Sequence, residues 1–273
     1  MKPSSRKATV TKISNTSASR APRGMSEDEW QARVDLAAAY RLTALMGWTD
    51  MLGTHISVRV PGTEDEFLIN PYGMLFEEIT ASSLVRIDVD GNKLSDSPYN
   101  VNQAGFTIHS AIHMGAPEAH AVMHLHTANG VGVATQKDGL LPATQMALTA
   151  MNLVRYHDYE GVAFDHTERE RLVKSLGDGG MLILRNHGTL TVGATVAEMF
   201  ARMYRLERAC KFQITAQAGG SELNRIPQEV VDHAIQQGRE IYTKGSKGQA
   251  AGGDLLWSAL KRKLEREDPD YAV

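Results

Sequence analysis

The chain has 273 residues, of which 42% are hydrophobic and 22% are charged, and its formal net charge is −3. The composition is that of a globular protein, with no apolar run long enough to span a bilayer and no electrostatic basis for binding nucleic acid. The single cysteine, Cys210, excludes an internal disulfide and fits a reducing compartment. We therefore expect a cytoplasmic protein without a membrane or nucleic-acid partner, and an inert, buried Cys210 thiol.

Charge and composition divide the chain into three parts. Residues 1–25 carry six Lys and Arg side chains, no acidic residue and no aromatic residue. Such a segment cannot bury enough apolar surface to order itself, so we predict a disordered basic tail. We expect one folded domain over residues 26–243. A Gly- and Ser-rich break and a charged, helical C-terminal tail are predicted for residues 244–273.

The first predicted helix begins at Ser26, whose spacing to Glu29 is that of a capping box, and it ends at Gly47. Strand-like and helix-like patterns then intersperse along the chain, which indicates an α/β or α+β domain. In chain order we expect strands at 55–60 and 67–70, a hairpin at 85–95, a helix at 102–115, a strand at 121–126, a short strand at 160–164, a helix at 167–176, a buried strand at 181–185, a turn at 186–189, and a helix that starts at the Thr195–Glu198 capping box and ends at 219–220.

His124 and His126 stand two residues apart in the predicted strand at 121–126. Side chains two apart on a strand project from the same face, so the two imidazoles can share one metal ion. The competing interpretation is a pair of partly buried histidines that are hydrogen-bonded to their neighbours. On spacing alone the sequence leaves both interpretations open.

A catalytic metal site commonly has three protein ligands and one open position, so a third ligand is needed. His187 follows the end of the predicted buried strand at 181–185, where a rigid scaffold presents functional side chains. Gly188 would let the backbone approach closely or take a positive φ. A plain turn histidine is the alternative for His187, and the residues alone favour it.

The other histidines lack such spacing. His109 and His113 share a helix face, but no acidic residue lies between them as in a zinc-binding H-E-x-x-H motif, so we expect packing and hydrogen bonding. No G-x-G-x-x-G, P-loop or G-x-S-x-G motif is present. Surface or capping positions are expected for the remaining histidines considered, His120, His157, His166 and His233.

Three ordered motifs resemble the class II aldolase and adducin family over residues 26–220. They are Asn102-Gln103-Ala104-Gly105-Phe106, the segment AVMHLHT at 121–127, and Arg185-Asn186-His187-Gly188. Features closer to the adducin head-like branch, in a bacterial-type protein, are Gly47-Trp48, the segment ASSL at 81–84, and Tyr156-His157-Asp158-Tyr159.

The resemblance implies a three-layer α/β/α fold around a largely antiparallel central sheet. It also implies that His124, His126 and His187 are the ligands of a divalent metal ion, and that the protein is a homotetramer with sites near the subunit interfaces. Zn²⁺ suits an all-nitrogen ligand set best, while Mn²⁺, Fe²⁺ or Co²⁺ can occupy such a site.

The sequence departs from the family pattern where the aldolases act on the substrate. The acidic residue that moves protons in the aldolases and epimerases corresponds to Gly105, and serines that hold phosphate correspond to Gln103 and Ala104. The Gly-Asn phosphate loop is replaced by Gly53-Thr54-His55-Ile56. Thr54, His55 and Gln103 thus remain as candidate substrate contacts, and the proton source is left open between water, His55 and another polar group.

Two functions follow as alternatives. One is a metal-dependent carbon–carbon lyase, of the aldolase or decarboxylase type, that acts on a small hydroxy-carbonyl or hydroxy-acid substrate through an enediolate. Decarboxylation suits the sequence better, since loss of CO2 needs no base to remove a hydroxyl proton. The other is a non-catalytic, adducin-like oligomerisation module that keeps a metal ion.

Overall fold

The computed structural model describes residues 21–161, 168–244 and 253–273. Within these ranges seven strands form one sheet in the order β3-β2-β1-β4-β7-β6-β5. Neighbouring strands are antiparallel except for β5 and β6, which are parallel. The strands are β1 (His55–Arg59), β2 (Glu66–Ile69), β3 (Val85–Asp88), β4 (Ala121–Leu125), β5 (Val154–His157), β6 (Met181–Leu184) and β7 (Gly188–Gly193).

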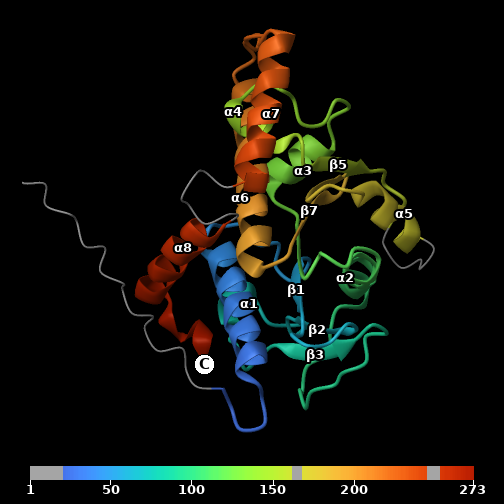
Figure 1. Ribbon diagram of the computed structural model, residues 1–273, viewed down its shortest axis with the longest axis vertical. Coiled ribbons are helices and arrows are strands. Elements are labelled where there is room, and N and C mark those ends of the chain that lie inside the picture. Colours follow the sequence, from blue (N-terminus) through green and yellow to red (C-terminus); the bar gives the residue numbers. More distant parts are fainter. Residues whose placement is uncertain (1–20, 162–167, 245–252) are drawn as a thin grey trace, which may run out of the picture.

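Helices cover both faces of this sheet (Figure 1). On one face α1 contacts β1, and α6 contacts β4 and β7, while on the other face α2 contacts β1 and β4, and α5 contacts β5 and β6. The expected three-layer α/β/α architecture with a largely antiparallel sheet is confirmed. The helices in the described ranges are α1 (Glu27–Leu45), η1 (Phe76–Glu78), α2 (Gln103–Gly115), α3 (Ala128–Ala134), α4 (Gln145–Ala150), α5 (Glu168–Leu176), α6 (Val196–Ala218), α7 (Gln228–Lys244), α8 (Asp254–Glu267) and η2 (Pro269–Ala272).

Alternation along β4 separates the two cores. Met123 and Leu125 pack in the cluster that contains residues of α1 and α6, whereas Val122 packs with residues of α2 and α5. Since successive side chains on a strand point to opposite faces, His124 lies on the α2 side together with Val122. His124 therefore belongs to the layer between the sheet and α2.

The helix starts predicted at Ser26 and Thr195 are confirmed. Ser26 accepts a hydrogen bond from the Glu29 backbone nitrogen at 3.1 Å, and Thr195 accepts one from Glu198 at the same distance. The buried Glu29 carboxylate bonds to Arg33 and Arg86, at 3.0 and 2.8 Å, so this side chain joins α1 to β3.

Several sequence expectations differ from the structure. Strands β5 and β7 were not predicted. The expected strand at 160–164 fails where the structure describes it, because Glu160 and Gly161 lie outside any strand, and residues 162–164 fall outside the described ranges, as does the expected cap at Thr167. In the predicted hairpin at 85–95 the second arm contributes only an isolated bridge from Lys93 to Ile87.

The C-terminal helix α8 packs on the body of the molecule. Trp257 is buried, its indole nitrogen donates to Asp35 at 3.2 Å, and its ring lies 5.6 Å from that of Phe200. Lys261 forms an ion pair with the same Asp35 at 2.9 Å. These contacts join α8 to α1 and α6. The predicted tail at 1–25 and the predicted break at 244–253 fall largely outside the described ranges.

Candidate metal centre

Three segments bring His124, His126 and His187 together. His124 lies on β4, His126 stands just beyond its end, and His187 occupies the turn between β6 and β7. Because β4 pairs with β7, the turn that carries His187 lies beside the end of β4. The turn needs a left-handed residue, and Asn186 supplies it with φ of 56°.

Two roles were expected for Gly188, a close approach of the backbone or a positive φ, and the close approach is confirmed. Gly188 is not among the residues with positive φ. A Cβ at Gly188 would lie 2.5 Å from the Leu125 carbonyl oxygen and 3.0 Å from Cδ2 of His126. The absence of a side chain thus lets β7 approach the end of β4 closely, which is what brings His187 to the other two histidines.

The three imidazoles form a compact cluster. Their ring centroids lie 4.7 Å apart for His124 and His126, 4.7 Å for His124 and His187, and 4.8 Å for His126 and His187. One nitrogen from each ring fits within a group whose members are all within 4.8 Å of one another. His124 is buried, while His126 and His187 are partly exposed, so the cluster opens to solvent on one side.

Hydrogen bonds fix the ring orientations of two of these histidines. His124 Nδ1 donates to the Thr189 carbonyl at 3.0 Å, and His126 Nδ1 donates to an Asp50 carboxylate oxygen at 2.9 Å. With the proton on Nδ1, each ring keeps an unprotonated Nε2, and the two Nε2 atoms lie only 2.9 Å apart. Two facing lone pairs repel unless a proton or a cation lies between them. An Nδ1–H bonded to a carbonyl or carboxylate is also the usual outer partner of a metal-binding histidine, so the donor set fits a divalent ion.

Two of the three histidines, His124 and His187, are held neutral at physiological pH, as a cation site requires. Burial is the largest cause that lowers the pKa of His124 well below its usual range, and neighbouring imidazoles lower it further. Burial likewise lowers the pKa of His187 to about 4, with a further contribution from His126.

Asp50 was missed by the sequence reasoning. It lies 76 positions before His126, and no spacing motif relates the two. The loop is shaped around it, since the Gly53 nitrogen donates to the Asp50 carbonyl at 2.7 Å and a Cβ on Gly53 would lie 2.9 Å from the Asp50 carboxylate. Met51 in the same loop adopts φ of 46° and is exposed.

A buried carboxylate holds the chain that follows His126. Glu207 on α6 accepts from the Thr127 hydroxyl at 2.5 Å and from the Asn129 side chain at 2.7 Å. Thr127 also caps α3 by accepting from the Gly130 nitrogen at 3.0 Å. Burial raises the pKa of Glu207. These bonds tie the end of β4 to α6, a link that no sequence motif indicated.

The three candidate substrate contacts, His55, Thr54 and Gln103, differ in their surroundings. His55 is the direct cross-strand partner of His124, with ring centroids 5.3 Å apart. Thr54 is buried, and its hydroxyl oxygen has no hydrogen-bond partner among the described residues. Gln103 begins α2, but its side chain lies outside the described set.

Gly105 faces the His55 ring. A Cβ on Gly105 would lie 2.2 Å from Cδ2 and 2.4 Å from Nε2 of His55. The imidazole therefore fills the space that any side chain at Gly105 would need. This contact gives a physical reason for glycine at a position inside a helix, where glycine costs about 1 kcal/mol relative to alanine.

Of the predictions for other single residues, some are confirmed and one is wrong. His109 and His113 are buried and hydrogen-bonded, as expected. The surface or capping position predicted for His157 is wrong, because this residue ends β5, is buried, and bonds through Nδ1 to the Ser175 hydroxyl at 3.0 Å. Cys210 is buried, and burial raises the pKa of its thiol, which confirms an inert cysteine. His166 falls outside the described ranges.

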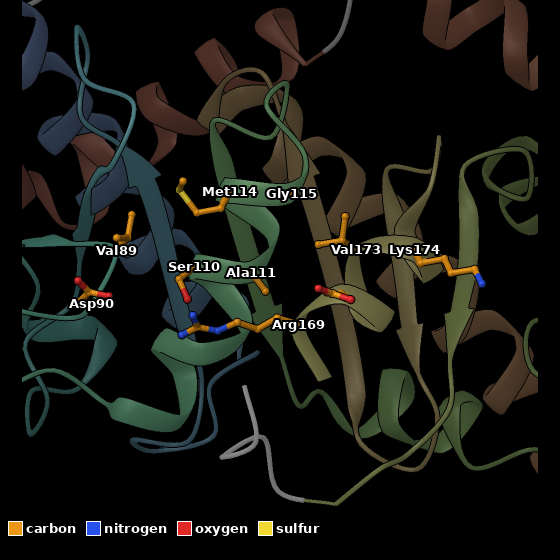
Figure 2. A pocket seen from close by; sticks show the side chains of 10 residues that line it. Val89, Asp90, Ser110, Ala111, Met114, Gly115, Arg169, Val173 and Lys174 are labelled. Atoms are coloured by element: carbon orange, nitrogen blue, oxygen red, sulfur yellow. The ribbon is translucent and has the colours of Figure 1, made fainter. Parts of the chain in front are cut away.

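A groove of about 570 Å³ lies between α2, α5 and the turn after β3 (Figure 2). It opens on the outer side of α2, and none of its lining residues belongs to the histidine cluster. Its wall is formed by Val89, Asp90, Ser110, Ala111, Met114, Gly115, Arg169, Glu170, Val173 and Lys174.

Comparison with known proteins identifies the family to which this sequence is similar. Residues 34–214 match the model of the class II aldolase and adducin N-terminal domain. A protein of Caulobacter vibrioides, provisionally named as an aldolase class 2 protein, is 52% identical over 91% of this chain and 94% of its own length. Rat alpha-adducin is 44% identical over 85% of this chain, but the match spans only 32% of alpha-adducin.

Solved structures agree with the sequence matches. An aldolase II superfamily protein from Pseudomonas syringae superimposes with a TM-score of 0.86 at 48% identity, covering 92% of this chain and 98% of the other. An L-fuculose 1-phosphate aldolase from Glaciozyma antarctica gives 0.76 at 25% identity, covering 93% and 97%. No helix in the described parts of this chain combines the length and apolarity needed to cross a membrane. By its fold, its motifs and these matches, the chain belongs to the class II aldolase and adducin family.

Proposed function

We propose that this protein is a metal-dependent carbon–carbon lyase, of the aldolase or decarboxylase type, that acts on a small hydroxy-carbonyl or hydroxy-acid substrate. The observation that carries the proposal is the pair of Nε2 atoms of His124 and His126, 2.9 Å apart, with both Nδ1 atoms bonded to acceptors. His187 supplies the third nitrogen of the set, and Zn²⁺ is the ion that an all-nitrogen set favours.

The chemistry of such a site follows from its donors. His124, His126 and His187 would hold the divalent cation, which would supply Lewis-acid stabilisation of the negative charge that cleavage places on the substrate oxygens. The chain's own residues aim the three nitrogens. Thr189 and Asp50 hold the rings, and the partial exposure of His126 and His187 leaves a route for a small molecule.

The substrate we propose is not a sugar phosphate. In place of the Gly-Asn phosphate loop the chain has Thr54 and His55, both buried, and the His55 ring is hydrogen-bonded to His109 at 2.7 Å. Neither side chain offers the positive charge that favours a phosphate, because threonine is uncharged and burial lowers the pKa of His55 to about 3. The name of the Glaciozyma antarctica neighbour identifies a sugar-phosphate substrate for that protein, and we expect the two proteins to differ in this respect.

A second function, a non-catalytic adducin-like oligomerisation module, is favoured by Gly105. The position carries no carboxylate, and the His55 ring occupies the space in which a side chain would stand. The 44% identity to rat alpha-adducin over most of this chain adds weight to this alternative. A homotetramer in the cytoplasm is the assembly we propose under either function.

Metal analysis combined with substrate screening tests both proposals. The purified protein is expected to hold about one metal ion per chain, and a triple variant, H124A/H126A/H187A, is expected to hold almost none. The exposed His233 provides the control variant H233A, which should retain the wild-type content. Equal metal content in the triple variant and the wild type would refute the metal centre. Metal without turnover of any hydroxy-acid or aldol substrate would instead favour the module.

A further inference from the structure

A continuous chain of hydrogen bonds connects four side chains between the sheet and α2. His55 Nδ1 lies 2.7 Å from His109 Nε2, and His109 Nδ1 lies 2.5 Å from the Ser57 hydroxyl. The same hydroxyl lies 2.7 Å from His113 Nε2, and His113 Nδ1 lies 2.8 Å from the Ala119 carbonyl. All four side chains are buried.

The far end of this chain fixes the direction of every bond in it. A carbonyl oxygen only accepts, so His113 must carry its proton on Nδ1, which leaves His113 Nε2 as an acceptor. Ser57 has one proton and must donate it to His113 Nε2. The Ser57 oxygen then accepts from His109, which places the His109 proton on Nδ1 as well.

The same count of protons and acceptors determines the tautomer of His55. A neutral His109 with its proton on Nδ1 has Nε2 free to accept, so His55 must donate from Nδ1. His55 Nε2 is left without a proton. We propose that Ser57, His109 and His113 are positioning residues that hold His55 in its Nδ1–H tautomer, so that the unprotonated Nε2 of His55 is a hydrogen-bond acceptor beside the candidate metal centre.

This count requires neutral imidazole rings, and the surroundings of His109 and His113 keep these rings neutral. Burial is the largest cause that lowers the pKa of His113 to about 3, and the nearby Arg59 guanidinium lowers it further. Burial lowers the pKa of His109 well below its usual range. Arg59 donates to the His113 carbonyl, which keeps this positive charge at the far end of the chain.

The chain of bonds orients His55 but cannot carry a proton away. It ends at the peptide carbonyl of Ala119, which does not take up a proton at physiological pH. The opposite end is the Cδ2–Nε2 edge of His55, which faces Gly105 and adjoins the ring of His124. The network therefore fixes the tautomer of His55 and offers no path for a proton.

This inference rests on the proposed lyase function and assigns to that site an imidazole nitrogen that would accept a hydrogen bond from a substrate hydroxyl. The accepting lone pair lies on the ring edge that faces Gly105 and adjoins His124, so it stands beside the nitrogens of the candidate metal centre.

Histidine tautomers can be measured directly by nitrogen NMR. In full-length, zinc-loaded protein labelled with ¹³C and ¹⁵N, magic-angle-spinning spectra distinguish protonated from unprotonated ring nitrogens, and correlations from each ring to its own backbone assign the signals. We expect His55, His109 and His113 all to be protonated on Nδ1 and unprotonated on Nε2. A His55 ring with its proton on Nε2, or with two protons, would overturn the proposal. This wild-type result decides the matter even if no variant folds.

A matched pair of serine variants tests the positioning role. S57A removes the central hydroxyl, so His109 loses its acceptor and the His55 signals should change from one tautomer to a mixture. S175A removes the hydroxyl that bonds His157, a partly buried serine–histidine pair outside this chain of bonds, and should leave His55 unchanged. A folded S57A with wild-type His55 signals would contradict the inference. The readout needs no turnover, so absence of lyase activity with the predicted tautomers would count against the proposed function alone.

Discussion

The Nδ1 atom of His126 lies 2.9 Å from a carboxylate oxygen of Asp50, a contact between residues 76 positions apart. The carboxylate fixes the ring so that Nε2 points at Nε2 of His124. It also strengthens the opposite nitrogen as a metal donor, because a negative charge next to the N–H favours donation of electron density from that nitrogen. Asp50 is half exposed, so water screens its charge in part.

Asp50→Asn is expected to weaken zinc binding by about 10- to 100-fold, the usual effect of losing an outer partner of a ligand histidine. The amide can still accept a hydrogen bond but lacks the charge. Competition with a chromogenic chelator measures the dissociation constant. Asp178→Asn is the matched control, because Asp178 is an exposed carboxylate in an ion pair with Arg155. Equal zinc affinity of D50N and D178N would show that Asp50 is not coupled to the metal.

Removal of the metal is expected to lower the thermal midpoint. A ligand at about 100 times its dissociation constant stabilises the folded state by about 2.7 kcal/mol. For a chain of this size that corresponds to a shift of roughly 5–10 °C. Calorimetry with zinc and with a chelator measures the shift. The triple variant H124A/H126A/H187A should melt at one temperature under both conditions, and a chelator effect that persists in it would point to a different binding site.

Gly105→Ala is expected to destabilise the fold, since its Cβ would lie 2.2 Å from the His55 ring. Overpacking costs about 1–3 kcal/mol, from which the helix propensity of alanine recovers about 1 kcal/mol. In an H55A background the penalty should vanish, which makes the two substitutions non-additive. Urea denaturation of the four proteins measures the coupling.

A glycine elsewhere provides the control for this cycle. Gly132 lies on α3, and a Cβ there would meet only the end of the flexible Ile214 side chain at 3.1 Å. We expect G132A to change the free energy of unfolding by the same amount with and without H55A. Additive effects of G105A and H55A would mean that the His55 ring does not fill the space beside Gly105.

In the metal-free protein, the free energy of unfolding is expected to decrease as the pH is lowered below about 6.5. Folding lowers the pKa of His55 and His113 to about 3 each, so the unfolded chain binds more protons than the folded one between these values. The stabilisation is complete above the unfolded pKa of about 6.5 and is lost progressively as the pH falls toward 3. Urea titrations at a series of pH values measure the slope.

The variant H113Q tests the assignment of this slope. It removes one group that titrates only on unfolding, so its stability should depend less steeply on pH between 6.5 and 4 than that of the wild type. H233A, at an exposed position, should keep the wild-type slope. An H113Q slope equal to that of the wild type would assign the pH dependence to other groups.

Local sequence patterns determined the parts of this protein that depend on local geometry. The period of two on a strand placed His124 and His126 on one face, and the capping residues Ser26 and Thr195 marked where α1 and α6 begin. A continuous apolar run identified β6, and family motifs added His187. These features could be predicted because neighbours along the chain fix them.

Only the tertiary structure decided what surrounds the histidines. Strand β7 begins at Gly188, inside the turn predicted at 186–189, and pairing with β4 and β6 on both sides makes it a central strand. Asp50 reaches His126 from a loop, and pairing of β1 with β4 sets His55 opposite His124. The bonds of Ser57 to His109 and His113 arise because α2 packs over β1. Such contacts join residues far apart in the chain, so strand order and helix packing create them and local periodicity does not.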